Sequence, residues 1–307
     1  MRPNFRRNRR SFLLLFSVLF LGYSNAQTVQ STKDVFYANY FATPKTDLKD
    51  ANGTISQNVI DVKINTPTIK VGENLLINNV FSAKAIINDI DTIENMILPF
   101  PEELYELNYS LPIRHSISES WKMIYIPSIN VRSDFAERQF NKDLLFPQVL
   151  VAALKTSKKN PDFRWGFGIN YNNNQAKNSI LPVLVLLYSK PKMNLNIRLP
   201  QSATITFMPS KKNEYGFSFN LEGSITNLQN EAYPEAANYL QRQNFYLFPY
   251  FSKNITSNLW LNLKGGILFN NTYNFVNDNY KSENETFENS LQPTIFMQLG
   301  ISYRLNK

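Results

Sequence analysis

The segment that decides the fold is residues 294–305, T-I-F-M-Q-L-G-I-S-Y-R-L. Alternate positions carry large apolar or aromatic side chains: Ile295, Met297, Leu299, Ile301, Tyr303 and Leu305. The positions between them are mostly polar or small: Phe296, Gln298, Gly300, Ser302 and Arg304. A period of two is the side-chain period of a β-strand. We therefore interpret this segment as a strand with one continuous apolar face.

The same alternation recurs along the chain. It is clearest in F-R-W-G-F-G-I-N-Y at residues 163–171, where aromatic and aliphatic side chains alternate with Arg, Gly and Asn. Other examples are residues 58–65, 194–199, 215–222 and 259–269. A tilted strand of about 9–11 residues crosses the hydrocarbon layer of a membrane. We predict an all-β fold, an antiparallel transmembrane β-barrel whose apolar face contacts lipid.

Residues 1–26 have the features of a secretory signal peptide. The basic start carries five arginines: Arg2, Arg6, Arg7, Arg9 and Arg10. The apolar run F-L-L-L-F-S-V-L-F-L at residues 12–21 is too short for a spanning helix, and Ser24-Asn25-Ala26 fits a cleavage site. We expect cleavage after export and a barrel made of residues 27–307. An uncleaved N-terminal membrane anchor is the alternative.

Much of the basic charge belongs to this signal peptide. The full chain has 32 Lys+Arg and 24 Asp+Glu, a net charge of +8. Without the five arginines, 27 Lys+Arg stand against 24 Asp+Glu, and the net charge falls to +3. So small a charge gives little reason to expect a nucleic-acid partner. The chain has no cysteine, which excludes disulfides, thiolate metal sites and a lipid-bearing cysteine behind the signal peptide.

Turn lengths predict how the strands are oriented. Bacterial barrels have short periplasmic turns and long outer loops. The long polar segments 227–243 and 271–293 are expected outside. Five shorter polar turns are expected at the periplasmic end: residues 114–120, 156–162, 189–192, 210–214 and 252–258.

The same rule predicts about 12–14 strands, and the number must be even. The larger number requires a strand at residues 146–155 and two strands within residues 194–208, separated at Pro200-Gln201. The smaller number applies if neither condition holds, and residues 149–154 are then helical within an outer loop.

The face opposite the lipid-facing side chains predicts the lining of the lumen. Its polar members are Asp61, Lys63, Asn65, Arg164, Asn170, Asn196, Arg198, Asn220, Glu222, Asn262, Lys264, Gln298 and Arg304. These side chains either plug a narrow barrel by pairing with one another or line a hydrated path for a small polar solute. Wide channels begin at roughly 16–18 strands, so this lumen is expected to be narrow. The mixture of charges predicts no strong charge selectivity.

Catalytic and metal-binding patterns are lacking in the sequence. His115 is the single histidine, and Ser118 and Glu119 are its sequence neighbours in a predicted periplasmic turn. A hydrolase usually pairs its histidine with a nucleophile or a carboxylate, and a turn is a poor place for such a site. We find no G-x-S-x-G, P-loop or H-E-x-x-H motif. The acidic residues of 277–289 lack the spacing of a calcium loop. We therefore predict no enzymatic activity, no cofactor and no metal.

Several short motifs resemble one known family. They are Trp121 leading into Ser133-Asp134-Phe135, Trp165-Gly166-Phe167-Gly168, Leu181-Pro182 followed by Tyr188, Leu199-Pro200, Tyr215-Gly216-Phe217, and Leu299-Gly300-Ile301-Ser302-Tyr303-Arg304. From about residue 104 onward, the chain resembles a family of Gram-negative outer-membrane β-barrels that carries only a domain-of-unknown-function label. The resemblance implies location and fold, and it brings no substrate or catalytic residue. The chain departs from barrels in general at its end, Leu305-Asn306-Lys307, where an aromatic residue commonly signals to the assembly machinery.

Together these features predict a non-catalytic integral outer-membrane protein, either a narrow pore for small polar solutes or a structural barrel. The expected partners are outer-membrane lipid, the barrel-assembly machinery during insertion and a small polar solute. Two alternatives stay open: an outer-membrane hydrolase that uses His115, and a soluble periplasmic or surface β-sandwich that acts as an adhesin.

Overall fold

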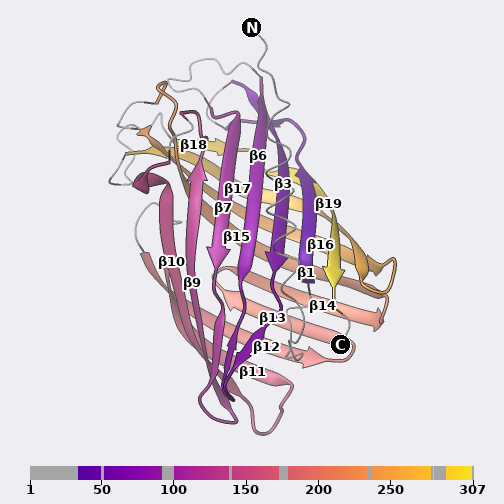
Figure 1. The fold of residues 1–307 in the computed structure, drawn as a ribbon. Coiled ribbons are helices and arrows are strands. Elements are labelled where there is room, and N and C mark those ends of the chain that lie inside the picture. The colour runs from indigo at the N-terminus through magenta and orange to yellow at the C-terminus, as the bar shows by residue number, and fades with distance from the viewer. Residues whose placement is uncertain are drawn as a thin grey trace, which may run out of the picture.

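The chain folds into a single closed antiparallel β-barrel (Figure 1). The computed structural model describes residues 34–49, 52–91, 100–137, 140–172, 179–233, 237–277, 279 and 288–305. The predicted signal peptide and the acidic positions Asp278, Glu283 and Glu285 lie outside these residues. Within the described part of the chain, no helix is both long enough and apolar enough to cross a membrane.

Nineteen strands form one sheet, and five of them are short segments that extend or flank the others. The remaining fourteen make the ring: β1 (Asp34–Ala42), β3 (Thr54–Asn65), β6 (Val80–Ile90), β7 (Glu103–Ser110), β9 (Trp121–Ser133), β10 (Leu145–Thr156), β11 (Phe163–Asn172), β12 (Ser179–Lys190), β13 (Met193–Leu199), β14 (Ser202–Ser210), β15 (Asn213–Asn227), β16 (Tyr239–Asn254), β17 (Leu259–Val276) and β19 (Thr294–Arg304).

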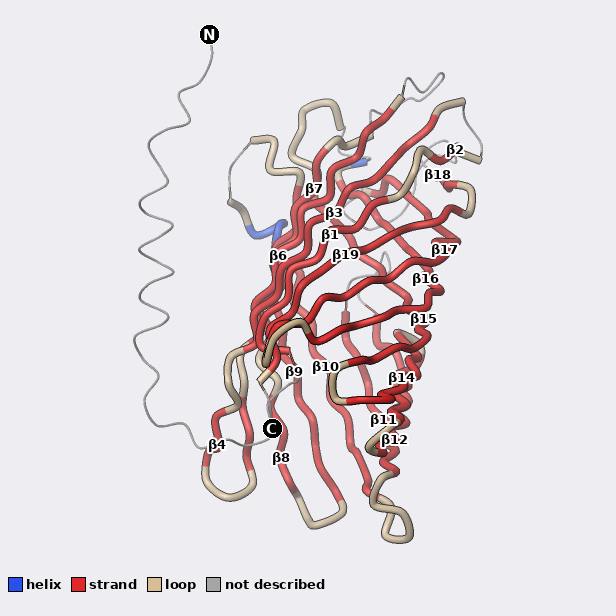
Figure 2. Tube along the Cα trace, turned by 90° about the vertical axis from the view of Figure 1, so that its right-hand side faces the viewer, coloured by secondary structure: helices blue, strands red, loops and turns tan. Residues whose placement is uncertain are grey.

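The short segments add to both ends of the barrel. They are β2 (Thr46–Asp47), β4 (Ile69–Val71), β5 (Leu75–Ile77), β8 (Ile113–Ser116) and β18 (Glu288–Leu291), and a single 3-10 turn, η1 (Lys142–Leu144), precedes β10. β4, β5 and β8 continue the wall beyond β3, β6 and β7, and Figure 2 shows β4 and β8 at the lower end of the barrel.

The ring closes where the first strand meets the last. β1 pairs with β3 on one edge and with β19 on the other, so that Tyr40 lies opposite both Ile60 and Leu299. Every other ring strand pairs with its neighbours in the sequence, as the ladders from β3 to β19 show. In the described residues, every ring strand has a partner strand along at least part of each of its two edges. Closure of this kind is what allows strands to stand in lipid.

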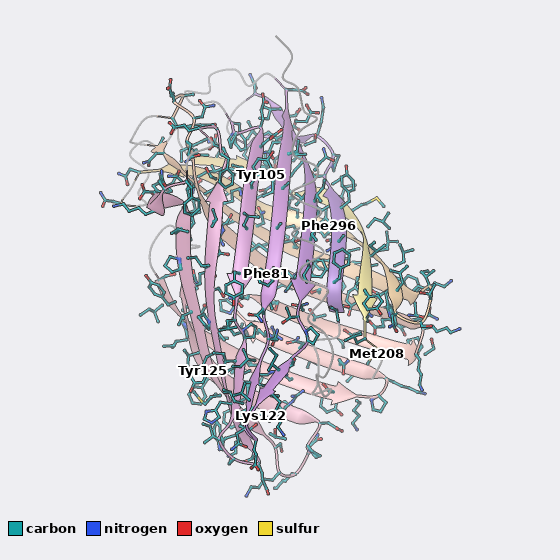
Figure 3. All side chains as sticks on the ribbon, in the orientation of Figure 1. Phe81, Tyr105, Lys122, Tyr125, Met208 and Phe296 are labelled. Carbon is teal, nitrogen blue, oxygen red and sulfur yellow. The ribbon has the colours of Figure 1, made fainter. Side chains whose placement is uncertain are left out.

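The outer face of the ring is apolar, as the alternation predicts. Its exposed side chains include Ile60, Phe81, Leu107, Ile129, Phe167, Leu184, Phe217, Leu263 and Met297. In the closing strand, Met297 is 65% exposed, whereas its neighbour Phe296, on the inner face, is 3% exposed. Figure 3 labels Phe81 on the outer face and Phe296 on the inner one. A soluble sandwich would bury its apolar faces between two sheets, and here the apolar face points outward around one closed ring.

The strand arrangement confirms the larger of the two predicted strand numbers. Residues 145–156 form β10 and not a helix, and β13 and β14 are separate strands joined at Pro200-Gln201. The five short polar turns consequently lie at one end of the barrel, together with the longer β3–β6 connection that carries β4 and β5 (Figure 2). The two-residue turn at Pro200-Gln201 lies at the opposite end, with the long loops.

Three predicted segments differ from the structure. The predicted outer loops 227–243 and 271–293 are partly strand, because β16 begins at Tyr239 and β17 continues to Val276. These strand ends were not marked by alternation, since their outward positions, such as Gln241 and Asn274, are polar. His115, predicted in a turn, belongs to β8 and pairs with Leu75 and Met123.

A contact across the ring narrows its upper end. The last residue of β15, Asn227, forms a parallel bridge with Ser133 at the end of β9. The Asp134 carboxylate accepts hydrogen bonds from the backbone N–H groups of Gln229 and Asn230 at 2.9 and 3.3 Å. These contacts join β9 and β15, which are far apart around the ring. They therefore divide the lumen near the long-loop end of the barrel.

Glycine on the inner face of β11 is required by close packing. A Cβ atom at Gly168 would lie 2.3 Å from the Val151 carbonyl oxygen and 2.7 Å from the Ala152 Cβ. We expect Gly168→Val to lower the free energy of unfolding by about 1–3 kcal/mol, the usual cost of overpacking. Gly265→Val is the matched control, since the nearest atom to its Cβ is 3.5 Å away. Urea unfolding in detergent, read by the heat-induced gel shift, compares them; equal stability of the two variants contradicts the packing account.

Candidate functional site

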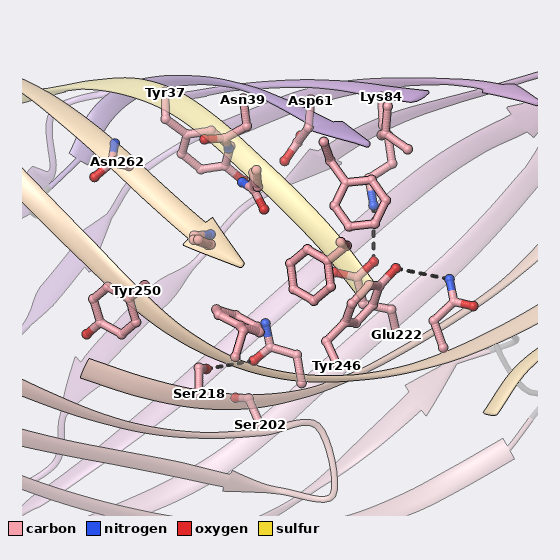
Figure 4. A pocket seen from close by; sticks show the side chains of 18 of the residues that line it. Tyr37, Asn39, Asp61, Lys84, Ser202, Ser218, Glu222, Tyr246, Tyr250 and Asn262 are labelled. Atoms are coloured by element: carbon pink, nitrogen blue, oxygen red, sulfur yellow. Dashed lines mark hydrogen bonds and ion pairs between the residues drawn. The ribbon is translucent and has the colours of Figure 1, made fainter. Parts of the chain in front are cut away.

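A chamber of about 740 Å³ lies inside the barrel (Figure 4). Its lining comes from β1, β3, β6 and β7 on one side and from β14, β15, β16, β17 and β19 on the other. Most lining positions alternate along each strand, because only every second side chain points inward. The chamber is therefore a product of the same period of two that makes the outer face apolar.

Ion pairs cross the chamber between strands that are distant in the sequence. Lys84 Nζ on β6 lies 3.3 Å from a Glu222 carboxylate oxygen on β15, and Figure 4 shows the two side chains pointing toward one another. Arg242 on β16 donates to Glu106 on β7 at 2.5 Å, and Arg132 Nε on β9 lies 4.0 Å from the same carboxylate. These pairs tie opposite walls of the barrel together.

A second charged group stands toward the short-turn end. Arg304, at the end of β19, donates to Asp34 at 2.5 Å and to Glu214 at 2.9 Å. Its guanidinium also lies 4.2 Å from the centre of the Trp260 ring, within the range of a cation–π contact. Arg304 thus joins the first and last strands of the ring to β15.

The chamber lining carries no net formal charge. Four acidic residues, Asp34, Asp61, Glu106 and Glu222, stand against four basic ones, Lys84, Arg242, Lys264 and Arg304. Balanced charge inside a narrow lumen gives no overall preference for cations or anions.

An apolar plug fills the lumen at the long-loop end. We call it the aromatic cluster; its ring-bearing members are Phe41, Phe100, Tyr233, Phe248, Tyr273, Phe275 and Phe296. Ring centres of Phe41 and Phe296 are 5.1 Å apart, and those of Phe100 and Tyr273 are 4.8 Å apart. Aliphatic residues such as Ile55, Leu104 and Leu240 complete the cluster. Every one of these side chains is at most 9% exposed, so the plug is dry and densely packed.

The aromatic cluster is shared between strands and outer loops. Phe41, Phe248 and Phe296 belong to the cluster and also form one wall of the chamber. Phe100 and Tyr233 come from connections between strands. Burial raises the pKa of the Tyr233 phenol, with further contributions from Asp134 and Glu102, so this hydroxyl stays neutral. Loop and strand residues together therefore close the chamber toward the outside.

The wall made by β9–β12 differs from the rest of the lumen. Leu154 on β10 and Val183 and Val185 on β12 pack together over the glycines of β11. Ile124, Leu150 and Leu187 are partly buried against them. We call these six residues the apolar wall. At these positions the inner faces of β10 and β12 are apolar, whereas β7, β9 and β16 carry the charged side chains of the ion pairs described above.

The structure divides the predicted lumen residues into two groups. Seven line the chamber: Asp61, Asn220, Glu222, Asn262, Lys264, Gln298 and Arg304. The other six lie outside it: Lys63, Asn65, Arg164, Asn170, Asn196 and Arg198. Among the second group, Lys63 lies over the Tyr37 ring, Asn65 donates to the Asp34 carbonyl, and Arg198 donates to Asn196. That any of them contacts a solute stays a prediction.

Several residues of the chamber were not predicted. Glu106 could have been found, because Tyr105, Leu107 and Tyr109 alternate with Glu106, Asn108 and Ser110 in β7. Lys84 is less visible, since Ile86 shares its face. Arg242 lies in a segment predicted as loop, where both faces of the strand are polar.

No hydrogen bond or ion pair of His115 to a carboxylate or hydroxyl is present in the described residues. No group of three or more His, Asp or Glu side chains is placed to hold a metal ion in the part of the chain that the structure describes.

A family model, Domain of unknown function (DUF6268), matches residues 25–304. The chain belongs to the DUF6268 family. No curated protein matches the sequence. With its closed ring and its apolar outer face, this DUF6268 protein is an integral outer-membrane β-barrel.

Solved structures with a similar chain path are outer-membrane barrels, mostly porins, channels and transporters. The COG4313 outer membrane channel from Pseudomonas putida F1 is 9% identical, with 92% of this chain and 99% of that chain covered and a TM-score of 0.44. The NanC porin is 9% identical, with 88% and 100% covered and a TM-score of 0.38. The protease OmpT from Escherichia coli is 8% identical, with 91% and 99% covered and a TM-score of 0.25. Structural similarity this low shows nothing about function. The function is therefore argued from the structure of this barrel.

The pair of Arg242 and Glu106 is expected to matter for stability. Both side chains are largely buried, at 6% and 16% exposed, so Arg242→Ala leaves a carboxylate with less compensation. Breaking such a pair typically costs about 3–5 kcal/mol. Arg198→Ala, which removes an exposed guanidinium bonded to Asn196, should change the free energy of unfolding by about 0.5 kcal/mol or less. Urea unfolding in detergent measures both; similar losses for the two variants contradict the assignment.

Proposed function

We propose that this DUF6268 barrel is a gated, narrow outer-membrane channel for small polar solutes. The observation that carries the proposal is a polar, charge-balanced chamber that ends at a dry aromatic cluster. The chamber holds the solute, and the aromatic cluster controls passage to the outside. Catalysis has no part in this function.

The size of the chamber sets the size of the solute. Single small ligands occupy sites of roughly 300–1,000 Å³, and the chamber of about 740 Å³ falls within that range. A fourteen-stranded ring is below the roughly 16–18 strands of wide aqueous porins. The channel therefore suits one small solute at a time.

The aromatic cluster is suited to gating. A constriction lined by apolar side chains excludes water, and an ion or polar solute cannot cross it without rehydration of the path. Because Phe100 and Tyr233 come from the loops, a change in loop position would separate them from Phe41, Phe248 and Phe296 on the strands. Loop movement is thus the proposed opening step.

A structural barrel is the rival function. In that case, the ion pairs and the aromatic cluster only fill the lumen, and removal of the aromatic rings exposes no continuous path. The two functions predict different conductance when side chains of the aromatic cluster are truncated.

Truncation of the aromatic cluster tests the gate. We expect the double variant Phe248→Ala, Phe296→Ala to raise single-channel conductance in planar bilayers and the swelling rate of liposomes in small sugars. The wild type should show only brief or small openings. Phe217→Ala and Leu263→Ala, which remove lipid-facing side chains, are the matched control and should leave conductance unchanged. A folded double variant that conducts no more than the wild type contradicts the channel and favours the structural barrel.

Replacement of His115 tests the enzymatic alternative. The imidazole lies on β8, where it pairs with strands and not with a catalytic partner. We expect His115→Ala to leave conductance and the heat-induced gel shift unchanged. Lipid or peptide hydrolysis by the wild type that is lost in His115→Ala would overturn the non-catalytic assignment.

A further inference from the structure

At one place on β15, the residues that line the chamber do not alternate with residues that face away from it. On β3, β6, β16 and β17, only every second residue lines the chamber. On β15, five consecutive residues do so, from Asn220 to Ser224. Consecutive side chains of a strand point to opposite faces, so the chamber can contact both faces only where it passes around the edge of the strand.

The strand ladder ends at this same place. β14 pairs with β15 up to Ser202 opposite Asn220, and the Gln201 carbonyl accepts the last hydrogen bond, from Leu221 N–H at 2.8 Å. Above it, the edge of β15 from Glu222 to Thr226 has no strand partner in the described residues. The next contact on this edge is the bridge from Asn227 to Ser133.

On the other side of the β13–β14 hairpin, part of the edge of β12 is also without a strand partner. β12 pairs with β13 only from Leu184 to Lys190, where Leu184 lies opposite Leu199. The upper part of β12, Ser179 to Val183, has no partner on that edge within the described residues. The β13–β14 hairpin therefore stops about 13 Å along the strand below Ile180, at roughly 3.3 Å per residue.

The gap above the β13–β14 hairpin is bordered by apolar side chains. Ile180 is 68% exposed on the outer face of β12, and Leu184 and Leu199 are exposed beside the hairpin. On the β15 side, Ile225 lies in the part of the strand without a β14 partner and packs with Phe146, Tyr239 and Val276 in a buried cluster. The gap thus has apolar side chains on both of the strands that border it.

Next to this gap, the chamber contains a buried guanidinium with an unused hydrogen-bond donor. Arg132 and Arg242 both approach one carboxylate, that of Glu106. Arg242 is 5% exposed, and its Nε–H has no hydrogen-bond partner among the described residues. A buried donor without a partner is costly, and an anionic group placed there would satisfy it.

The path from this donor to the membrane is apolar on one side. Val183, in the unpaired part of β12, belongs to the apolar wall with Leu154 and Val185. An acyl chain that leaves over the β13–β14 hairpin would pass Val183 on the β12 side and Arg198 near the hairpin turn, where Arg198 lies opposite Ser202. A polar head and an apolar tail are therefore accommodated side by side.

We propose that the chamber opens sideways over the β13–β14 hairpin and takes a single-chain carboxylate amphiphile from, or delivers it to, the outer leaflet. The carboxylate binds at Arg242, and the tail extends through the gap beside the free edge of β15. The inference rests on the proposed function only in treating the chamber as a space that holds a solute.

Photo-crosslinking in lipid nanodiscs tests the route. The probe is dodecanoic acid with a diazirine close to its carboxylate, and dodecanol with the same diazirine is the uncharged comparison. Adducts are mapped by mass spectrometry. We expect the acid to label Arg242, Tyr246 and the Pro200-Gln201 turn of the wild type, and the alcohol to label lipid-facing residues only.

Two matched glycine variants separate the sideways route from an axial one. Gly223→Trp places an indole at the free edge of β15, whereas Gly265→Trp places one on the lipid face of β17. We expect loss of chamber labelling in Gly223→Trp and full labelling in Gly265→Trp. Equal labelling of the chamber in both variants overturns the sideways route, and equal labelling by acid and alcohol overturns the carboxylate site.

A second measurement does not depend on the tryptophan variants folding. The chain has no cysteine, so Ser224→Cys and Asn262→Cys each carry one nitroxide label. We expect oxygen dissolved in the lipid to relax the label at residue 224, beside the gap, more strongly than the label at residue 262. Equal relaxation overturns the opening. Solute flux through the gate variants is unaffected by this outcome, so failure of the inference and failure of the channel are distinguishable.

Discussion

In hydrocarbon, an unpaired N–H or C=O group costs several kcal/mol, so each lipid-facing strand of this chain needs a partner on both edges. The ladder between β1 and β19 meets that need for the first and last strands, which are more than 250 residues apart in the chain. Once the ring is closed, every second side chain points to lipid and the others share the lumen. The apolar outer face, the polar chamber and the aromatic cluster all depend on this closure.

Different parts of the lumen are filled by different kinds of side chains, and each kind has its own effect on the barrel. Phe41, Phe248 and Phe296 on the strands pack with loop residues into a buried plug. Nearer the loop ends of β16 and β7, Arg242 and Glu106 carry charges that are compensated across the barrel. Buried ion pairs are weak contributors to stability when compared with apolar packing, but their loss is costly. A chamber built from them keeps its walls at a defined distance without filling the space.

Prediction from sequence succeeded where alternation is strong and failed where it is weak. The strand of Trp165 and the closing strand of Met297 have a clean period of two, and both stand in the ring as expected. The upper parts of β15, β16 and β17 have polar side chains on both faces, so Arg242 was assigned to a loop. The break at Pro200-Gln201 decided the strand number, because only a turn there separates β13 from β14.

The sequence by itself determined the barrel class and its lipid-facing residues, since a period of two is a local property of the chain. Only the tertiary structure decided which inward side chains meet. Lys84 and Glu222 are 138 residues apart, and strand register and ring closure bring them within 3.3 Å. The free edge of β15 is likewise invisible in the sequence, because it exists only where two neighbouring strands end earlier than β15 does.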